Sequence, residues 1–207
     1  MLTVHHLNES RSQRILWLLE ELGLPYDIKF YERDAKTRLA PPELKAVHPL
    51  GKSPIVTDNG QTIIESGAIV DYIIRTYGNG QLQPAVDGPE YTPYVEWLHY
   101  AEGSAMLPLM LKLYTSRLPD GGAGLQPRIA DEMANHLGYL ESSLEGRDYL
   151  LGDITGADIQ MSFVGEFAGI FGQRATHPNI DGWVKRFQAR PAYRRALERG
   201  GPYPLAR

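Results

Sequence analysis

The 207-residue sequence contains no cysteine. This absence excludes a disulfide, a thiolate metal site, a cysteine nucleophile and a Cys-x-x-Cys redox pair. Any sulfur chemistry carried out by this protein must therefore use a thiol that a ligand brings.

The sequence also lacks a positive charge excess and long apolar runs. It has 21 Lys and Arg against 25 Asp and Glu, a formal net charge of −4, which argues against a general nucleic-acid binder. No run approaches the roughly 18 apolar residues of a membrane span. The N-terminal MLTVHHLNES lacks the cationic start and apolar stretch of a secretory signal. We expect a cytoplasmic protein with no nucleic-acid or membrane partner.

Histidine is sparse. The six residues include one close pair, His5 and His6, and adjacent residues of a strand face opposite sides. We therefore expect no metal site.

The first part of the chain alternates strand and helix. A strand is predicted over 2–7, a helix over 10–23 with apolar residues at helical spacing, and a second strand over 26–31 with alternating residues. Ser10 and Gln13 have the spacing of a capping box at the helix start. This order predicts a βαβ unit with parallel strands.

A hairpin and another helix follow. Residues 54–57 and 61–64 flank Asn59-Gly60, a strong signal for a tight antiparallel turn. Glu65-Ser66 opens a helix that ends at Gly78. The first domain, predicted over 1–78, thus has the order βαβ(α)ββα.

Residues 79–90 are rich in Gly, Pro and polar groups, and predict a linker. The remainder, 91–207, is predicted to be an all-helical domain, so the fold class is α+β. Thr155 and Asp158 form a predicted capping box. The expected helices cover 94–118 with a kink at Pro108, 129–144, a segment starting at 154, 180–188 and 192–198.

Four segments carry a family resemblance. They are SRSQRILWLLEELG after the first strand, HPLGKSPIV at 48–56, IIESGAIVDYI at 63–73, and TGAD at 155–158. In this order they resemble the cytosolic glutathione transferases, most closely the bacterial and fungal branch with N-x-S-R-S-x-R after the first strand. The resemblance implies a thioredoxin-like N-terminal domain, an all-α C-terminal domain, a homodimer and a role in detoxification. Glutathione would be a co-substrate, with no cofactor.

The resemblance also implies roles for residues around Pro54. An X-Pro bond is the favourable place for a cis peptide, which would turn the Ser53 backbone outward at a strand edge. By resemblance, the Ser53 main chain would bind the cysteinyl part of glutathione. Lys52, and less directly His48, would meet the glycyl carboxylate. From the residues alone, Pro54 could equally begin an edge strand.

Glu65 and Ser66 lie where a strand becomes a helix, and a helix N-terminus favours a carboxylate. By resemblance, Ser66 would bind the γ-glutamyl carboxylate and Glu65 would face the ammonium group. An ordinary N-cap at Ser66 is the structural alternative.

The thiolate needs a hydrogen-bond donor, because a free thiol titrates at about pH 8.5. In the family this donor follows the first strand. Ser10 is the preferred candidate here, with Asn8, Ser12 and Arg11 as alternatives. A gap-free alignment with serine-type members puts Glu9 at the usual serine position.

The electrophile pocket is expected on the first long helix of the second half. From the residues alone, aromatic and Met side chains at helical spacing also fit a buried core. The candidate pocket residues are Tyr100, Ser104, Met106 and Tyr114, with Trp97 nearby.

The sequence leaves three functions open. The leading one is conjugation of the glutathione thiolate to small apolar electrophiles. The alternatives are glutathione-dependent peroxide reduction at the same site, and a non-catalytic ligand-binding or assembly module. Cysteine-dependent thioltransferase or dehalogenase chemistry is disfavoured.

Overall fold

The computed structural model describes residues 1–206. The chain folds into two compact units. The division falls between Gln83 and Pro84, within the predicted linker 79–90. Residues 187–206 group with the first unit rather than with the predicted helical domain 91–207. The second unit therefore consists of residues 84–186.

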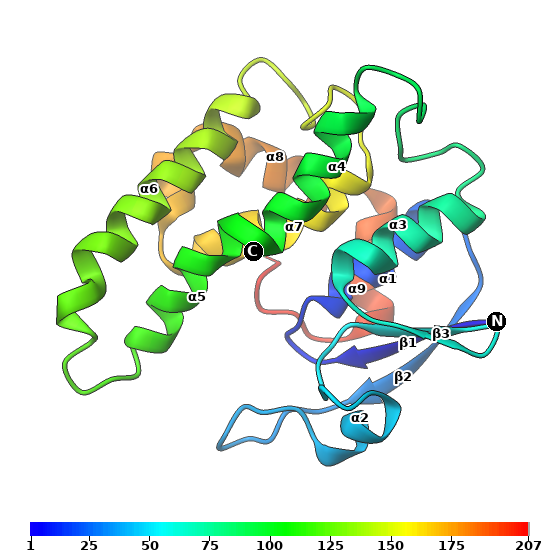
Figure 1. Ribbon diagram of the computed structural model, residues 1–207, viewed down its shortest axis with the longest axis horizontal. Helices are drawn as coiled ribbons and strands as arrows, with labels where there is room; N and C mark the ends of the chain where they lie inside the picture. Colours follow the sequence, from blue (N-terminus) through cyan, green and yellow to red (C-terminus); the bar gives the residue numbers. More distant parts are fainter. Residues whose placement is uncertain (207) are drawn as a thin grey trace. The chain divides into compact units, whose positions relative to one another are not determined.

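The first unit is built on a four-stranded sheet with the order β2-β1-β3-β4 (Figure 1). β1 pairs with β2 in parallel, whereas β3 pairs with β1 and β4 in antiparallel fashion. This is the predicted βαβ unit followed by a hairpin. The strands are β1 (Leu2–Leu7), β2 (Tyr26–Tyr31), β3 (Ile55–Asp58) and β4 (Gln61–Ile63).

Helices cover both faces of this sheet. The helices α1 (Ser12–Glu21), α3 (Ser66–Tyr77) and α9 (Pro191–Gly200) lie on one side, and α2 (Pro42–Val47) lies on the other (Figure 1). On the α2 side, Leu44 packs into a cluster with Leu7, Tyr31 and Ile55.

α9 packs closely on α1, although Arg195 and Glu20, which pair across this contact, are 175 residues apart in the sequence. The Trp17 ring stacks on Phe187, with ring centroids 5.1 Å apart, and meets Tyr193 edge-on. Arg195 and Arg199 both pair with Glu20. These aromatic and ionic contacts explain why the C-terminal residues belong to the first unit.

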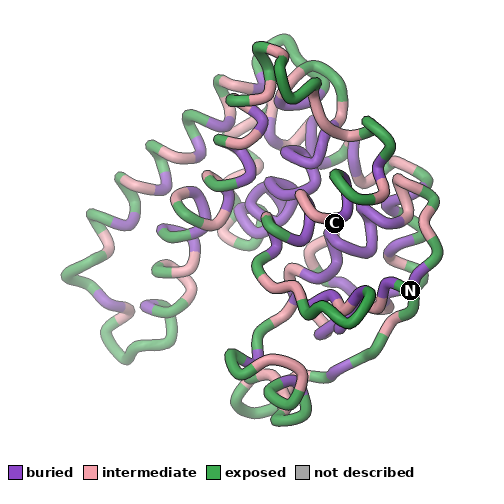
Figure 2. The backbone as a smooth tube through the Cα atoms, turned by 45° about the vertical axis from the view of Figure 1, so that its right-hand side comes forward, coloured by how far each residue is buried: buried purple, intermediate pink, exposed green. Residues whose placement is uncertain are grey.

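The second unit is helical. Figure 2 shows buried and exposed positions alternating along its helices, as expected when one face of each helix packs inward. Its helices are α4 (Tyr91–Tyr100), a π-helical segment (Ala101–Ala105), α5 (Met106–Thr115), α6 (Gln126–Ser143), α7 (Gly156–Ile170) and α8 (Pro178–Gln188), which ends in the first unit.

The predicted single helix over 94–118 is interrupted by the π-helical segment rather than bent at Pro108. Pro108 lies within α5 and has no N–H to donate to the carbonyl of Ser104 one turn earlier. A π-helical turn just before a proline lets the backbone adjust to that missing bond.

The capping box at α7 is present as predicted. The Thr155 hydroxyl accepts a hydrogen bond from the Ala157 amide at 3.2 Å, and the Thr155 amide donates to Asp158 at 2.9 Å. Asp158 also accepts hydrogen bonds from the Leu150 amide and the Trp183 indole, so it ties α7 to α8.

In the described part of the chain, no helix is both long and apolar enough to cross a membrane.

Candidate functional site

The turn between β1 and α1 is held by Arg33. The Asn8 side-chain oxygen accepts a hydrogen bond from the Arg33 amide at 2.8 Å, and the Asn8 and Glu9 carbonyls accept from the Arg33 guanidinium. Glu9 has a φ of +51°, a region that side-chain-bearing residues enter uncommonly. This turn directs Ser10 toward the start of β3.

Ser10 is 4% exposed, and its hydroxyl meets two other serines. The Ser10 Oγ lies 2.7 Å from Ser12 Oγ and 3.4 Å from Ser53 Oγ. It also accepts a hydrogen bond from the Ser12 amide at 3.2 Å. Two segments that the sequence singled out, the turn after β1 and the residues before β3, therefore meet at Ser10 and Ser53.

The predicted capping box of Ser10 and Gln13 is wrong. The N-cap of α1 is Arg11, without a side-chain cap, and the Gln13 amide donates to the Ser10 carbonyl rather than to its hydroxyl. The reason is local: the Ser10 hydroxyl bonds the amide two residues on, at Ser12. A hydroxyl placed this way belongs to a turn preceding the helix.

Ser53 precedes a cis peptide bond to Pro54. Its hydroxyl donates to the His5 carbonyl at 3.1 Å. Its main-chain N–H and C=O make no hydrogen bond with other described residues, because the ladder between β1 and β3 ends at the pair of His5 and Ile55. The expectation of a strand edge is wrong, since β3 lies inside the sheet. The Ser53 N–H and C=O are unpaired because Ser53 lies just before the N-terminal end of β3.

α3 begins at Ser66, directly after Glu65 with a φ of +64°. Ser66 is buried, whereas the Glu65 side chain is exposed. A 12-residue helix carries partial positive charge at its N-terminus. An exposed carboxylate thus lies next to a helix start that favours an anion.

Lys52 and His48 lie on the segment that leads into Ser53. Lys52 is exposed and makes no ion pair or hydrogen bond with any other described residue. His48 is half-buried at the end of α2, and its Nδ1 accepts a hydrogen bond from the Leu50 amide at 3.4 Å. Of the predicted site residues, Ser10 and Ser53 are in direct contact through their hydroxyls.

A residue that the sequence reasoning missed lies behind the serines. His6 is 3% exposed, and its Nδ1 lies 2.9 Å from Ser12 Oγ. Burial lowers the pKa of His6 to about 4, although a hydrogen bond to the Gly200 backbone acts in the opposite direction. In the sequence the His5-His6 pair bears only on metal binding, because the contact with Ser12 depends on how the turn after β1 folds. His5 faces the other way and bonds the Tyr31 hydroxyl at 2.9 Å.

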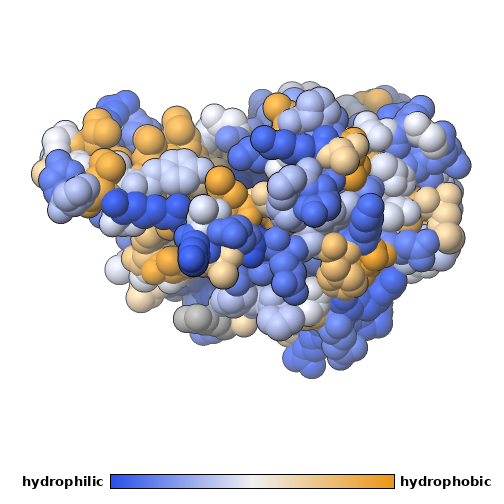
Figure 3. All heavy atoms as spheres, turned by 90° about the horizontal axis from the view of Figure 1, so that it is seen from below, coloured by the Kyte–Doolittle hydropathy of each residue, from blue (hydrophilic) through white to orange (hydrophobic). Residues whose placement is uncertain are grey.

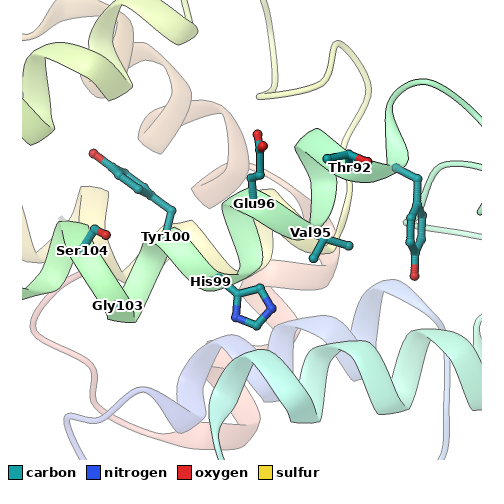
Figure 4. Close-up of a pocket in the computed structure, with 8 residues that line it drawn as sticks. Thr92, Val95, Glu96, His99, Tyr100, Gly103 and Ser104 are labelled. Carbon is teal, nitrogen blue, oxygen red and sulfur yellow. The ribbon is translucent and has the colours of Figure 1, made fainter.

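The second unit contains a cavity of about 670 Å³ along α4 and the π-helical segment (Figure 4). Tyr100 and Ser104, two of the residues predicted for the electrophile pocket, are in its lining. Met106 does not, because its side chain is buried in the core, and Tyr114 does not, because it lies exposed on α5. The lining residues are Tyr91, Thr92, Val95, Glu96, His99, Tyr100, Gly103 and Ser104.

Tyr100 is the most constrained residue of this lining. Its hydroxyl lies 2.7 Å from Nδ1 of His136, and its ring meets Trp97 edge-on. Burial, and to a lesser degree Tyr139, raises the pKa of Tyr100 to about 12. Trp97 itself is buried and stacks on Tyr139, so it belongs to the core. His99 was missed, although it follows Thr92 and Glu96 at helical spacing.

Two family models match the chain. Residues 1–75 match the N-terminal domain of glutathione S-transferase, and residues 105–191 match its C-terminal domain. The chain belongs to the glutathione S-transferase family. Most of α9 lies beyond the matched ranges.

Individual relatives agree with this membership. The transferase is 35% identical to glutathione S-transferase 3 of Schizosaccharomyces pombe, over 96% of this chain and 88% of the relative. A glutathione S-transferase structure from Actinobacillus pleuropneumoniae is 34% identical, with a TM-score of 0.88, covering 100% of this chain and 96% of that one. A glutathione transferase from Burkholderia graminis, solved with two glutathione molecules per subunit, is 28% identical with a TM-score of 0.78, covering 95% and 87%.

Proposed function

We propose that this transferase binds glutathione in its first unit and transfers the glutathione thiolate to small apolar electrophiles. The observation that carries the proposal is the position of the Ser10 hydroxyl, 3.4 Å from the hydroxyl of Ser53, whose own main-chain N–H and C=O have no partner among the described residues. An extended peptide can pair with such free main-chain groups. In this proposal the cysteinyl part of glutathione does so, and its sulfur lies by Ser10, with glutathione as the co-substrate.

The charged ends of glutathione fit the surrounding groups. The N-terminus of α3 at Ser66 favours the γ-glutamyl carboxylate, and the exposed Glu65 complements the neighbouring ammonium group. Lys52 is an exposed cation without an ion pair in the described structure, which suits the glycyl carboxylate, with His48 beside it on the same segment.

Thiolate formation is the catalytic contribution that we assign to Ser10. A free thiol has a pKa of about 8.5, so only a few per cent is ionised at neutral pH. A hydrogen bond donated to the sulfur favours the charged form. Asn8 stays an alternative donor, because only its side-chain oxygen is bonded, to the Arg33 amide, and its NH2 group can donate.

For the electrophile, we propose the cavity in the second unit, with Tyr100 and Ser104 in its lining. The lining combines the aromatic rings of Tyr91 and Tyr100 and the aliphatic Val95 with polar side chains that can orient a small molecule. Met106 and Tyr114 are not part of this proposed pocket, for the reasons of burial and position given above.

We also propose a homodimer and a cytoplasmic location. Leu107, Leu111 and Tyr114 are exposed at spacings of four and three along α5, a continuous apolar stripe. Figure 3 shows hydrophobic side chains gathered at the surface over the α5 and α6 end of the second unit. A stripe of this kind is typical of an interface between subunits. The cytoplasm keeps glutathione reduced, as the reaction needs.

The test combines binding and turnover. We expect wild-type protein to bind glutathione by calorimetry and to conjugate it to a chlorodinitrobenzene. Ser10→Ala should lower kcat by about tenfold or more, because one donor to the developing anion is lost, with glutathione affinity nearly kept. Ser116→Ala, an exposed serine on the second unit, is the matched control. Unchanged turnover in Ser10→Ala would remove Ser10 from the mechanism, and no glutathione binding by the wild type would overturn the proposed function.

A further inference from the structure

A buried row of hydrogen-bonding groups runs from the proposed thiol site into the interior of the first unit. From Ser53 it passes to the Ser10 hydroxyl, then to Ser12 Oγ at 2.7 Å and to Nδ1 of His6 at 2.9 Å. The imidazole also bonds the backbone of Gly200, near the end of α9. The row thus joins the proposed site to the C-terminal helix.

The short contacts decide where the hydrogens lie. Two oxygens 2.7 Å apart, and an oxygen and nitrogen 2.9 Å apart, each need one hydrogen between them. Burial lowers the pKa of His6 to about 4, so its ring is neutral at pH 7 and carries one N–H. If this hydrogen is on Nε2, the two short contacts fix the direction of both serine hydroxyls.

Gly200 selects that nitrogen. A backbone carbonyl can only accept, and Nδ1 is already engaged with Ser12, so the ring hydrogen lies on Nε2. Nδ1 then accepts from the Ser12 hydroxyl, and Ser12 Oγ accepts from Ser10. The longer contacts of these hydroxyls, 3.4 Å from Ser10 to Ser53 Oγ and 3.4 Å from Ser12 to the Leu7 carbonyl, then hold no hydrogen. The backbone of Gly200 comes close to α1, because a Cβ there would lie 2.5 Å from Gln13 Oε1 and 2.8 Å from Leu16 Cδ1, so these side-chain ends would have to move. This close approach brings the end of α9 within reach of His6.

We propose that His6 is a positioning residue which, held by Gly200 and acting through Ser12, turns the Ser10 hydrogen inward and so restrains its donation to the glutathione sulfur. This inference rests on the proposed function. When the thiolate forms, Ser10 must give up its short bond to Ser12 in order to donate to sulfur. Ser12 and His6 therefore weaken the stabilisation of the thiolate and set how far its pKa falls.

The ring hydrogen can be located directly on the wild-type protein. The ¹⁵N chemical shifts of imidazole nitrogens distinguish the Nε2–H form from the Nδ1–H form, and the His6→Gln variant assigns the signals. We expect the Nε2–H form at pH 7 in the protein without ligand. The Nδ1–H form would overturn the proposal, because His6 would then donate to Ser12 and could not draw the Ser12 hydrogen, or through it the Ser10 hydrogen, inward. This measurement needs neither glutathione nor a stable Ser12 variant.

The second experiment measures the thiol pKa of bound glutathione by ultraviolet difference titration. Ser10→Ala should decrease the thiolate fraction at pH 7 by about twofold or more, and Ser12→Ala should increase it by about twofold or more, because Ser10 is then free to donate. Ser162→Ala is the matched control, since Ser162 is a buried serine of the second unit that donates to the Ile159 carbonyl. Glutathione bound to Ser162→Ala should have the same thiolate fraction as glutathione bound to the wild type.

The outcomes separate the two proposals. A thiolate fraction that falls in Ser12→Ala, as in Ser10→Ala, would mean that Ser12 supports donation, and would overturn the inference. No change in either variant would place Ser10 away from the sulfur and overturn it as well. Absence of glutathione binding by the wild type would overturn the proposed function alone, and the ¹⁵N measurement would still stand as a test of the hydroxyl directions.

Discussion

Arg190 and Glu21 form a two-point ion pair between the residue preceding α9 and the last residue of α1. The Arg190 Nε lies 2.5 Å from Glu21 Oε1, and its Nη2 lies 2.9 Å from Oε2. Glu21 Oε1 also accepts the Trp17 indole hydrogen at 2.8 Å. This ion pair holds the start of α9 against the end of α1 in the first unit.

Arg190→Ala should lower the free energy of unfolding by about 2 kcal/mol, because it leaves a mostly buried carboxylate without its charged partner. Urea denaturation measures this change. Arg190→Lys should restore part of the loss, since it keeps the charge but not the paired geometry. Glu21→Gln keeps the acceptor for Trp17, and a double-mutant cycle with Arg190→Ala isolates the pair. A coupling energy near zero would contradict the assignment.

Replacing His6 should change the pH dependence of stability. Burial lowers the pKa of His6 from 6.5 to about 4, so between these values the unfolded chain binds more protons than the folded protein. Stability from this group is complete above pH 6.5 and is lost as the pH falls toward 4, by about 3 kcal/mol at most. His6→Gln removes this dependence.

The comparison must be made between wild type and variant, because other groups titrate in the same window. Burial raises the pKa of Asp158 to about 6, which makes stability rise as the pH falls through this range. Denaturant midpoints of both proteins from pH 7 to pH 4 should converge toward low pH. Parallel curves would show that His6 does not titrate in this way.

Gln13→Met should stabilise the protein by about 1 kcal/mol. Gln13 is 2% exposed on α1, and within residues 1–206 neither its side-chain nitrogen nor its oxygen has a hydrogen-bond partner. Methionine has a similar shape without the cost of burying an amide. Thermal unfolding measures the effect, with Gln81→Met, an exposed glutamine, as the control. A lower melting temperature would mean that the amide has a bound partner, such as a buried water.

Asp158→Ala should destabilise the protein by about 3 kcal/mol or more. The substitution leaves the Leu150 amide, the Thr155 amide and the Trp183 indole without their acceptor in a buried place. Asp153→Ala, on the exposed loop just before α7, should change stability by about 0.5 kcal/mol or less. Denaturant unfolding of both variants gives the comparison. Equal losses of stability in the two variants would contradict the role of Asp158 in joining α7 to α8.

Features that depend on neighbours in the chain could be predicted from the sequence. The hairpin at Asn59-Gly60 and the capping box of Thr155 and Asp158 are set by a few adjacent residues, and both are present. Apolar spacing also predicted β1, α1, β2 and α3, whereas α2 was expected only as an element without a residue range. The capping box predicted from the spacing of Ser10 and Gln13 is absent, because the Ser10 hydroxyl instead accepts the Ser12 amide in a turn.

The sequence by itself thus determined the strands, most of the helices, their order and the family, because periodicity and motifs are local. Only the tertiary structure decided that Ser12, Gln13 and His6 are buried, because α9 is folded back onto α1 from the far end of the chain. It also decided that the Ser10 hydroxyl meets Ser53 and Ser12, since hydrogen-bond geometry depends on distances across elements. The order of the elements follows from patterns along the chain, whereas the direction of a single hydroxyl follows from the packing around it.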